Sequence, residues 1–588
     1  MLPLQRDLER NVEGEVRFDT YTRILYSTDA SSYQIEPIGV VIPKSVADVI
    51  ATVEIARTHR VPILPRGGGT SLAGQAVGHA VHLDMSKYMN KILEVNAEEQ
   101  WVRVQPGVVL DELNAYLRPT GLFFGPNVSP SNRANIGGMI GNNSSGSHSI
   151  IYGKTIDNVE ELKVILTDGR EVHLKALTPE ELHAKQLSPG IEGQAYRTVA
   201  RVVDRNRDEI LRRYPKVMRR VSGYNLDEFV KDQPFNLTKL LVGSEGTLAV
   251  VTEAKLKLVP RPKMTAVDVV HFRDLIEAME ASQEILNHHP AAIELIDRMI
   301  INMTRSSLEY SRKMTFVEGD PAALLFVEFH GESREELEEK LVNLEARLKE
   351  KGYGFAYVRA LEEEEKGNIW AVRKAGLGLL LGVKGDRKPL AFVEDTAVAP
   401  EKLPQFVKRF TEIIESHETT AGYYGHASVG CLHIRPLINM KQASEIKKMR
   451  SIAEQVLRLV MEFEGAMSGE HGDGLARSEW NEIFFGSQLY NAFREVKRAF
   501  DPYGMMNPGK IVDAPRMDEN LRYGADYQAI QVPTHLDFSR EGGFDRAIEL
   551  CNGMGVCRKK IEGTMCPSFM VTMDEEHSTR GRANLLRA

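Results

Sequence analysis

Three histidines and one glutamate lie in two short glycine-rich segments in the second half of the chain: His426, His433, Glu470 and His471. Two imidazoles with one carboxylate are a common ligand set for a divalent metal that keeps open positions for a substrate. The further imidazole of His471 has the chemistry of a general base near neutral pH. The alternative for these residues is a group of buried, hydrogen-bonded histidines beside a glycine turn.

The spacing of the first two histidines limits the element that can hold them. Strand side chains alternate between faces, so His426 and His433, seven residues apart, would point to opposite sides of one flat strand. Ser428–Gly430 can supply a turn or bulge, and we predict that two neighbouring strands bring both imidazoles together. Cys431 falls within this hairpin, where we assign it to packing.

A second kind of chemistry is indicated by the glycine-rich segment 65–74, Pro-Arg-Gly-Gly-Gly-Thr-Ser-Leu-Ala-Gly, which follows an apolar run. Glycine lets the backbone approach a ligand closely, and consecutive amides can form an anion-binding nest. The segment is not a Walker loop, and the chain has no GxGxxG motif that would indicate a Rossmann nucleotide site. Alone, it could be a simple glycine turn.

Three further segments, 125–146, 152–157 and 242–248, are similarly rich in Gly, Ser, Asn and Thr. They supply amide and hydroxyl donors but little packing volume, so they are suited to wrapping a polar ligand. In order and spacing, the four segments resemble the FAD-binding domain of the vanillyl-alcohol oxidase and p-cresol methylhydroxylase (PCMH) flavoproteins over residues 30–260.

This resemblance implies FAD, with the first loop on its pyrophosphate and the later segments along the rest of the cofactor. Some relatives attach the flavin through a histidine, where this chain has Thr70, so we expect non-covalent FAD. The residues implied in cofactor binding are Arg66, Gly67, Gly68, Gly69, Thr70, Ser71, Pro126, Ser129, Gly137, Gly138, Asn142, Ser145, Gly146, Glu245 and Gly246.

The histidine segments resemble the metal centre of the FAD-dependent D-2-hydroxyacid dehydrogenases, of the D-2-hydroxyglutarate and D-lactate dehydrogenase type, in the same flavoprotein class. The resemblance implies that His426, His433 and Glu470 bind a divalent metal, zinc or similar. It implies that His471 is the catalytic base.

The same resemblance places two cations, Arg373 and Lys388, on the substrate carboxylates. A planar guanidinium suits bidentate carboxylate binding, and the alternative for each residue is an exposed surface charge. The chain departs from the family pattern at Leu377, where relatives have a substrate-contacting threonine, and at Arg435, where they have an asparagine. Arg435 either binds substrate as an extra cation or pairs with Glu470 and alters the metal.

Three of the four cysteines, Cys551, Cys557 and Cys566, lie close together near the end of the sequence. Their C-x5-C-x8-CP spacing is one thiol short of a ferredoxin motif. With residues 577–587, they resemble the segment that links two cluster motifs in long bacterial flavin/iron–sulfur dehydrogenases. This implies an iron–sulfur cluster, 4Fe-4S, with ligands incomplete in a chain that we expect to be part of a longer protein. The alternatives are a small zinc site or reduced, buried cysteines.

The elements that must position these residues suggest an α+β protein. Apolar β-branched runs predict strands at 38–42, 61–64, 323–329 and 390–393, and periodicity predicts helices at 46–59, 275–285 and 335–348. We expect an N-terminal extension (1–32), a PCMH-type FAD-binding domain (33–260), an FAD-linked oxidase C-terminal α+β domain (261–515) and a truncated, helical ferredoxin-like segment (516–588).

Composition narrows the classes of partner. The 588 residues are 42% hydrophobic and 27% charged, which argues against a mainly disordered or coiled-coil protein. A net charge of −8 gives no reason to expect nucleic acid. No apolar run approaches the roughly 20 residues that span a bilayer, and the first residues are too charged for a signal peptide. We expect a cytoplasmic protein; peripheral association with the inner face of the membrane and homo-oligomerisation stay open.

Together these features favour FAD-dependent oxidation of a small D-2-hydroxy acid, D-2-hydroxyglutarate first, to the 2-oxo acid. The expected route is metal-assisted deprotonation of the hydroxyl, hydride transfer to flavin and electron exit through an iron–sulfur cluster to an unidentified acceptor. One alternative is a D-lactate or glycolate dehydrogenase with the same parts. Another, from a different class, is a non-catalytic electron-transfer subunit.

Overall fold

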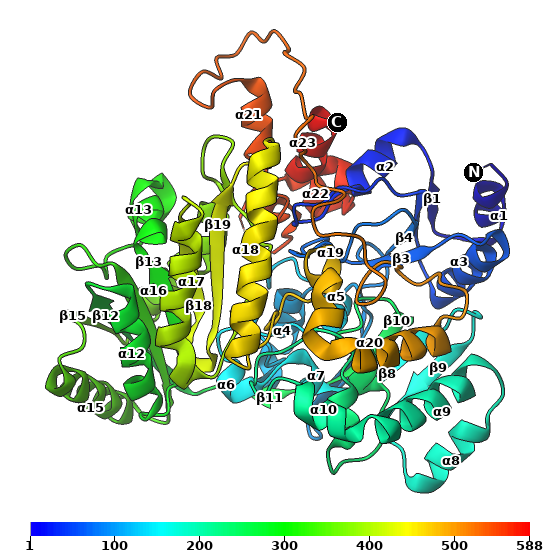
Figure 1. Ribbon diagram of the computed structural model, residues 1–588, viewed down its shortest axis with the longest axis horizontal. Coiled ribbons are helices and arrows are strands. Elements are labelled where there is room, and N and C mark those ends of the chain that lie inside the picture. The colour runs from blue at the N-terminus through cyan, green and yellow to red at the C-terminus, as the bar shows by residue number, and fades with distance from the viewer. Residues whose placement is uncertain (1, 562) are drawn as a thin grey trace.

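Two lobes, each built on its own β-structure, meet along the middle of the molecule (Figure 1). The computed structural model describes residues 2–561 and 563–588. The blue and cyan lobe contains a four-stranded and a five-stranded sheet, and the green and yellow lobe contains an eight-stranded sheet. The mixture of helices and sheets agrees with the predicted α+β class.

The four-stranded sheet begins with residues that we expected to form a separate extension. Across the sheet, its strands are β1 (Glu15–Arg17), β2 (Gly39–Ile42), β4 (Val81–Asp84) and β3 (Ile63–Arg66). The predicted helix is present as α3 (Val46–His59), capped by the Ser45 hydroxyl, and α1 (Leu2–Asn11) packs on it. The strand expected at 61–64 begins two residues later, as β3. The first residues are therefore part of this sheet.

The five-stranded sheet carries the helices of the first lobe. Its order is β5 (Ile92–Asn96), β6 (Trp101–Val104), β10 (Val250–Lys257), β8 (Val159–Ile165) and β9 (Glu171–Leu174). Helix α9 (Gly190–Arg205) packs against α20 (Asn481–Phe500), which lies among the cyan elements in Figure 1. Ile63 also donates its N–H to Met505 O at 2.8 Å. The end of the expected second domain thus packs on the first lobe.

The eight-stranded sheet is antiparallel and forms the second lobe. Its order is β15 (Ala356–Ala360), β12 (Met264–Phe272), β14 (Ala323–Gly331), β13 (Ala292–Asp297), β18 (Ala421–His426), β19 (Cys431–Ile438) and β16 (Lys388–Pro389), with β17 (Thr396–Ala397) also paired to β19. Its helices fall into two groups that join different cores. One group is α12 (Leu275–Leu286), α15 (Arg334–Lys351), α17 (Leu403–Ser416) and α18 (Ala443–Glu462), and the other is α13 (Arg298–Ser306) and α16 (Glu363–Leu381).

Alternation along the strands separates the two faces of this sheet. In β14, Leu325 and Val327 join the core shared with α12 and α15, whereas Leu324 and Phe326 join the core shared with α13 and α16. The same period of two leaves polar side chains of β13, β14, β18 and β19 on the α13/α16 face. This face meets the first lobe and carries the candidate chemistry.

The predicted hairpin is confirmed. Strands β18 and β19 are joined by the short turn Ala427–Val429 and by Gly430, whose φ is +65°. His426 lies opposite Cys431 and His433 lies opposite Tyr424, so the two histidines are diagonal neighbours on one face. Their ring centroids are 5.3 Å apart.

The strand predicted at 390–393 is wrong. These residues form a bend between β16 and β17, and their apolar side chains are buried against the core of the second lobe. The bend ends at Asp395, whose φ of +75° is incompatible with an extended strand. An apolar run of this length does not distinguish a strand from a buried connection.

The C-terminal residues contact both lobes, and Glu549 pairs with Lys441 of the second lobe at 2.7 Å. After a long stretch with little regular structure, α21 (Phe544–Glu549), α22 (Pro567–Thr572) and α23 (Thr579–Arg587) follow, and α23 packs against α2 (Thr20–Tyr26) (Figure 1). None of the described helices is long and apolar enough to cross a membrane.

The turn that aligns the two histidines should not tolerate a side chain. In Gly430→Ala, a Cβ would lie 1.9 Å from the Val398 carbonyl oxygen in a left-handed backbone conformation, so we expect a loss of about 3 kcal/mol in the free energy of unfolding. The control is Gly352→Ala, which has a φ of +77° but no atom within 4 Å of the new Cβ and should cost about 1 kcal/mol. Urea titration measures both; equal losses would contradict the steric argument.

Candidate active site

A cavity that is partly open to solvent lies where the two lobes meet. The glycine-rich loop after β3, helix α5 (Ile136–Asn142), α16 and the Glu470–His471 segment all contribute to its walls. Thirteen of the residues expected to bind cofactor line it: Arg66, Gly67, Gly68, Gly69, Thr70, Ser71, Ser129, Gly137, Gly138, Asn142, Ser145, Glu245 and Gly246. The two others, Pro126 and Gly146, are buried but do not line it, and a Cβ on Gly146 would meet Asn127 O at 2.0 Å.

Arg66 supports the glycine-rich loop from behind. Its guanidinium donates to the carbonyl oxygens of Tyr26, Thr28 and Ala76 at 3.2, 2.7 and 2.6 Å. A Cβ on Gly69 would meet the same guanidinium at 2.5 Å, and the φ of Gly69 is +62°. The structure therefore places the Arg66 side chain as a brace for the loop.

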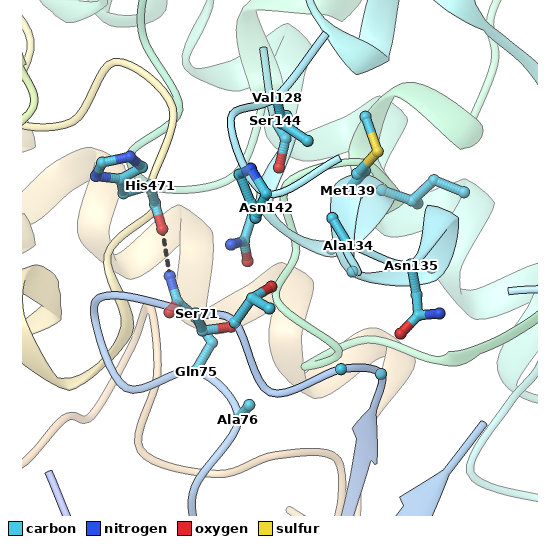
Figure 2. A pocket seen from close by; sticks show the side chains of 18 of the residues that line it. Ser71, Gln75, Ala76, Val128, Ala134, Asn135, Met139, Asn142, Ser144 and His471 are labelled. Atoms are coloured by element: carbon cyan, nitrogen blue, oxygen red, sulfur yellow. Dashed lines mark hydrogen bonds between the residues drawn. The ribbon is translucent and has the colours of Figure 1, made fainter. Parts of the chain in front are cut away.

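The cavity wall has the smooth, small-residue character that a large planar cofactor requires. A Cβ on Gly138 would have no atom within 4 Å, and one on Gly141 would have a single atom at that limit, so α5 presents open space to the cavity. Figure 2 shows Asn142 and Ser144 from this region, with Ser71 and Gln75 of the glycine-rich loop nearby and His471 farther along. The residues fit FAD, a long ligand with many hydrogen-bonding groups.

At one end of the cavity, two imidazoles converge on one carboxylate oxygen. The Nε2 atoms of His426 and His433 both lie 3.1 Å from Oε1 of Glu470. His471 Nε2 is 3.4 Å from the same oxygen, and its ring stacks on that of His433 with centroids 4.8 Å apart. Thus the structure brings together all four residues that the sequence singled out.

The far nitrogen of each ring is also held. His426 Nδ1 lies 2.7 Å from Glu294, and His433 Nδ1 lies 2.9 Å from Glu394. Metal-binding histidines are commonly fixed by a carboxylate on the other ring nitrogen, which orients the ring and raises its basicity. In chemistry, the donor set His426, His433 and Glu470 therefore fits a divalent metal. The donor atoms that the structure brings within 4.8 Å of one another are those of Asp395, His433, Glu470 and His471.

A buried arginine from the first lobe balances the central carboxylate. Arg219 donates to Oε2 of Glu470 at 2.8 Å and also to the Ser145 hydroxyl. Burial opposes ionisation, but Arg219 and His426 hold the pKa of Glu470 well below its usual range. The carboxylate is therefore charged, as a metal ligand must be.

The backbone that carries His471 is fixed from both lobes. Asp395 accepts the N–H groups of Glu470 and His471, at 3.1 and 2.8 Å, and the Ser468 hydroxyl at 2.6 Å. From the first lobe, Gln75 donates its amide to His471 O at 2.6 Å (Figure 2). Asp395 is thus an anchor for this segment.

Glu245 fixes the same segment farther along. Its carboxylate accepts the N–H groups of Asp473 and Gly474 at 2.6 and 3.0 Å. Burial, with the nearby Asp473, raises the pKa of Glu245 to about 8. Glu245 therefore links the cofactor cavity to the segment that carries the expected base.

The electrostatics around His471 favour a charged ring in the absence of a cation. Burial disfavours the imidazolium, but Glu394 and Asp395 outweigh it and raise the pKa of His471 to about 10. Nδ1 of His471 lies 2.6 Å from Glu394, which leaves Nε2 as the ring atom available to a ligand in the cavity.

The cations expected to bind substrate are placed differently from one another. Arg373, on α16, lines the cavity and donates to Glu294 at 2.7 Å. Lys388 lies outside the cavity lining and donates to the Val383 carbonyl. Arg435 is buried, donates to Tyr424 Oη at 3.0 Å and lies 3.2 Å from Glu394, not Glu470. Lys374, which we did not predict, lines the cavity beside Arg373.

Four other site residues were missed by sequence reasoning: Glu294, Glu394, Asp395 and Arg219. Glu294 is the one carboxylate inside the apolar stretch Ala292–Ile296, and the pair Glu394–Asp395 directly follows an apolar run. An acidic side chain in such a run is a usable signal, because buried carboxylates need partners. Arg219 carries no comparable signal, because it lies in an irregular segment.

The cysteine segment packs directly behind the glycine-rich loop. Arg580 donates to Gly68 O and Gly69 O at 2.9 and 3.2 Å, and its N–H approaches the Cys557 sulfur at 3.4 Å. Cys566 accepts the Thr579 N–H at 3.2 Å. Among the described residues, Cys551, Cys557 and Cys566 do not form one group with ligand atoms within 4.8 Å of each other.

Two family models match the two lobes. Residues 37–175 match an FAD binding domain, and residues 261–511 match the C-terminal domain of FAD linked oxidases. The chain therefore contains an FAD binding domain and the C-terminal domain of FAD linked oxidases. In fold, it is similar to p-cresol methylhydroxylase, with a TM-score of 0.63 and 14% identity over 87% of this chain and 97% of that one.

Two relatives in sequence carry named activities. The chain is 35% identical to D-2-hydroxyglutarate dehydrogenase of Pantoea ananatis over 98% of this chain and 57% of the relative. It is 29% identical to glycolate oxidase subunit GlcD of Bacillus subtilis over 86% of this chain and 95% of the relative. The chain therefore spans little more than half the length of the first of these relatives.

Filling the open space at α5 should block the cofactor without unfolding the protein. We expect Gly138→Leu to weaken FAD binding at least about tenfold, because the new side chain would occupy the cavity. Gly367→Leu is the matched control, because Gly367 is an exposed helical glycine whose added Cβ would likewise have no atom within 4 Å. Flavin fluorescence titration measures affinity, and equal FAD binding by both variants would contradict this assignment.

Proposed function

We propose that the protein oxidises a D-2-hydroxy acid to the corresponding 2-oxo acid, with D-2-hydroxyglutarate as the favoured substrate. The observation that carries this proposal is the convergence of Glu470, His433 and His471 at one end of the cavity of an FAD-binding fold, with Arg373 in the same wall. The similarity to D-2-hydroxyglutarate dehydrogenases supports the substrate class.

Bound FAD would supply the acceptor for the hydride that leaves the substrate Cα. A divalent ion held by His426, His433 and Glu470 would supply a Lewis acid for the hydroxyl oxygen and lower its pKa. Arg373 binds and orients the substrate carboxylate, because its guanidinium lies in the cavity wall and is itself oriented by Glu294.

His471 takes the hydroxyl proton at Nε2. Its other nitrogen is oriented by Glu394, which holds the ring and stabilises the imidazolium once the proton has been transferred. His471 must be neutral before it can accept the proton, and a cation beside Glu470 disfavours the imidazolium. The base therefore depends on an occupied metal site for its neutral form.

We extend the proposal to the cysteine segment as an electron exit. The support is proximity: Arg580 bonds to the glycine-rich loop, and Arg133 donates to the carbonyl of Met554, which lines the cofactor cavity, at 2.6 Å. Three thiols fall short of the four that hold a 4Fe-4S cluster, so a cluster here would need a further ligand.

Two alternatives make different use of the same cavity. A D-lactate or glycolate dehydrogenase would need one carboxylate site, and the similarity to glycolate oxidase subunit GlcD favours it. A non-catalytic electron-transfer subunit would bind FAD but leave the histidine cluster inert. That protein would contain no divalent ion, and no hydroxy acid would reduce its flavin.

Flavin reduction tests the proposed reaction. Under anaerobic conditions, D-2-hydroxyglutarate should bleach the flavin absorbance of the wild type, and chelation of the metal should slow this step. His471→Ala should still bind FAD but reduce it about 10² to 10⁴ times more slowly, because the base is lost. His183→Ala, a change at an exposed helical position, is the control. The proposal is wrong if no D-2-hydroxy acid bleaches the wild-type flavin.

Lys374 should separate dicarboxylic from monocarboxylic substrates. Because it lines the cavity beside Arg373, we expect Lys374→Ala to raise KM for D-2-hydroxyglutarate roughly tenfold or more while changing KM for D-lactate little. The control is Lys384→Ala, which removes an exposed lysine just beyond the end of α16. Equal effects on the KM of both substrates would mean that Lys374 does not bind the second carboxylate of D-2-hydroxyglutarate.

A further inference from the structure

A second group of two histidines and a glutamate lies outside the site described above. His148 Nε2 is 2.7 Å and His330 Nε2 is 3.1 Å from the same oxygen, Oε1 of Glu328. Glu328 and His330 are two residues apart on β14, so both point to one face of the sheet. His148 comes from the other lobe, at the start of α6 (Ser149–Tyr152). The cluster therefore bridges the two lobes.

Neighbouring polar groups orient the members of this cluster. Trp370 on α16 donates its indole N–H to the second oxygen of Glu328 at 2.8 Å, which leaves Oε1 for the imidazoles. In the structure the amide nitrogen of Asn127 faces Nδ1 of His148 at 2.6 Å, so a metal on Nε2, which leaves a proton on Nδ1, requires this amide to turn its oxygen toward the ring. The indole contact to Glu328 is of the kind that fixes the direction of a metal ligand's donor atoms.

The spacing of the donor atoms suits a single ion. One atom from each of His148, Glu328 and His330 can be chosen so that all lie within 4.8 Å of one another. Ligands about 2.0–2.2 Å from a zinc ion are separated by roughly 3–3.4 Å, so the two histidine–glutamate pairs, at 2.7 and 3.1 Å, are within a few tenths of an ångström of that separation. Two histidines and a glutamate with an open fourth position are a known zinc ligand set.

The cluster is open enough for an ion and water to enter. The Glu328 side chain is 6% exposed, whereas His148 and His330 are 14% and 21% exposed. The arrangement also repeats that around Glu470, where two Nε2 atoms again meet one carboxylate oxygen. A protonated His148–Glu328 ion pair alone would not require the third, separately placed imidazole.

We propose that His148, Glu328 and His330 bind a divalent transition-metal ion, for which zinc is the probe, and that this ion ties the two lobes together. His148 follows Ser144 and Ser145 in the cavity wall, and Trp370 lies one turn before Arg373 on α16. Binding the ion therefore restrains two walls of the cavity from outside it. The proposal does not depend on which substrate is oxidised.

Zinc stoichiometry tests the site. The FAD-loaded full chain is treated with a chelator, supplied with zinc and analysed by elemental mass spectrometry. We expect about two equivalents for the wild type, about one for Glu470→Gln, about one for His330→Ala and close to none for the double variant. His173→Ala, which removes an exposed histidine paired only with Glu161, is the matched control and should behave as the wild type.

A second measurement separates binding from misfolding. In the Glu470→Gln background, zinc should raise Tm progressively, with the logarithm of its concentration once the site is saturated, and His148→Ala should abolish this rise while leaving the metal-free Tm near that of its parent. Asn127→Ala and Trp370→Phe should weaken zinc binding about 10-fold to 100-fold. The proposal is overturned if Glu470→Gln protein binds no zinc, or if it binds the same amount with and without His330 and His148.

Discussion

The buried carboxylate of Glu470 is the constraint on which the arrangement of the site depends. A charge taken out of water is tolerated only when other charges and hydrogen bonds compensate it. Its partners come from both lobes: Arg219 from the first lobe, and His426 and His433 from the second. Separating the lobes would break the Arg219–Glu470 ion pair and leave both buried charges less compensated, so the interaction specifies how the lobes meet.

Two other buried carboxylates around the site, those of Glu294 and Glu394, are compensated by positively charged neighbours in the same way. Glu294 lies between His426 and Arg373, and Glu394 lies between two imidazoles and Arg435. Burial would raise the pKa of the Glu394 carboxyl, but Arg435 and His471 hold it well below its usual range. Arg435 therefore acts on the carboxylate that orients His471. Its position explains how a departure from the family pattern can be accommodated without a contact to Glu470.

Local patterns in the sequence were enough to predict much of the fold. Helix α3 was predicted to its terminal residues, because its apolar spacing marks it locally. The hairpin that carries His426 and His433 followed from strand alternation and a glycine turn. By contrast, the bend ending at Asp395 was predicted as a strand, because its burial depends on distant packing. No local pattern indicates that Arg580 will bond to the loop at Gly68, 512 residues away in the chain.

Local patterns also failed to show that the predicted domains share one site. Changes in composition along the sequence suggested separate units, yet the segment bearing His471 is held by Asp395 in one lobe and by Gln75 and Glu245 in the other. A loop held from one side alone could move relative to the cofactor cavity. Hydrogen bonds from both sides fix the imidazole relative to the glycine-rich loop and to the metal ligands at once. The chemistry therefore belongs to the junction between the lobes, and neither lobe could position it by itself.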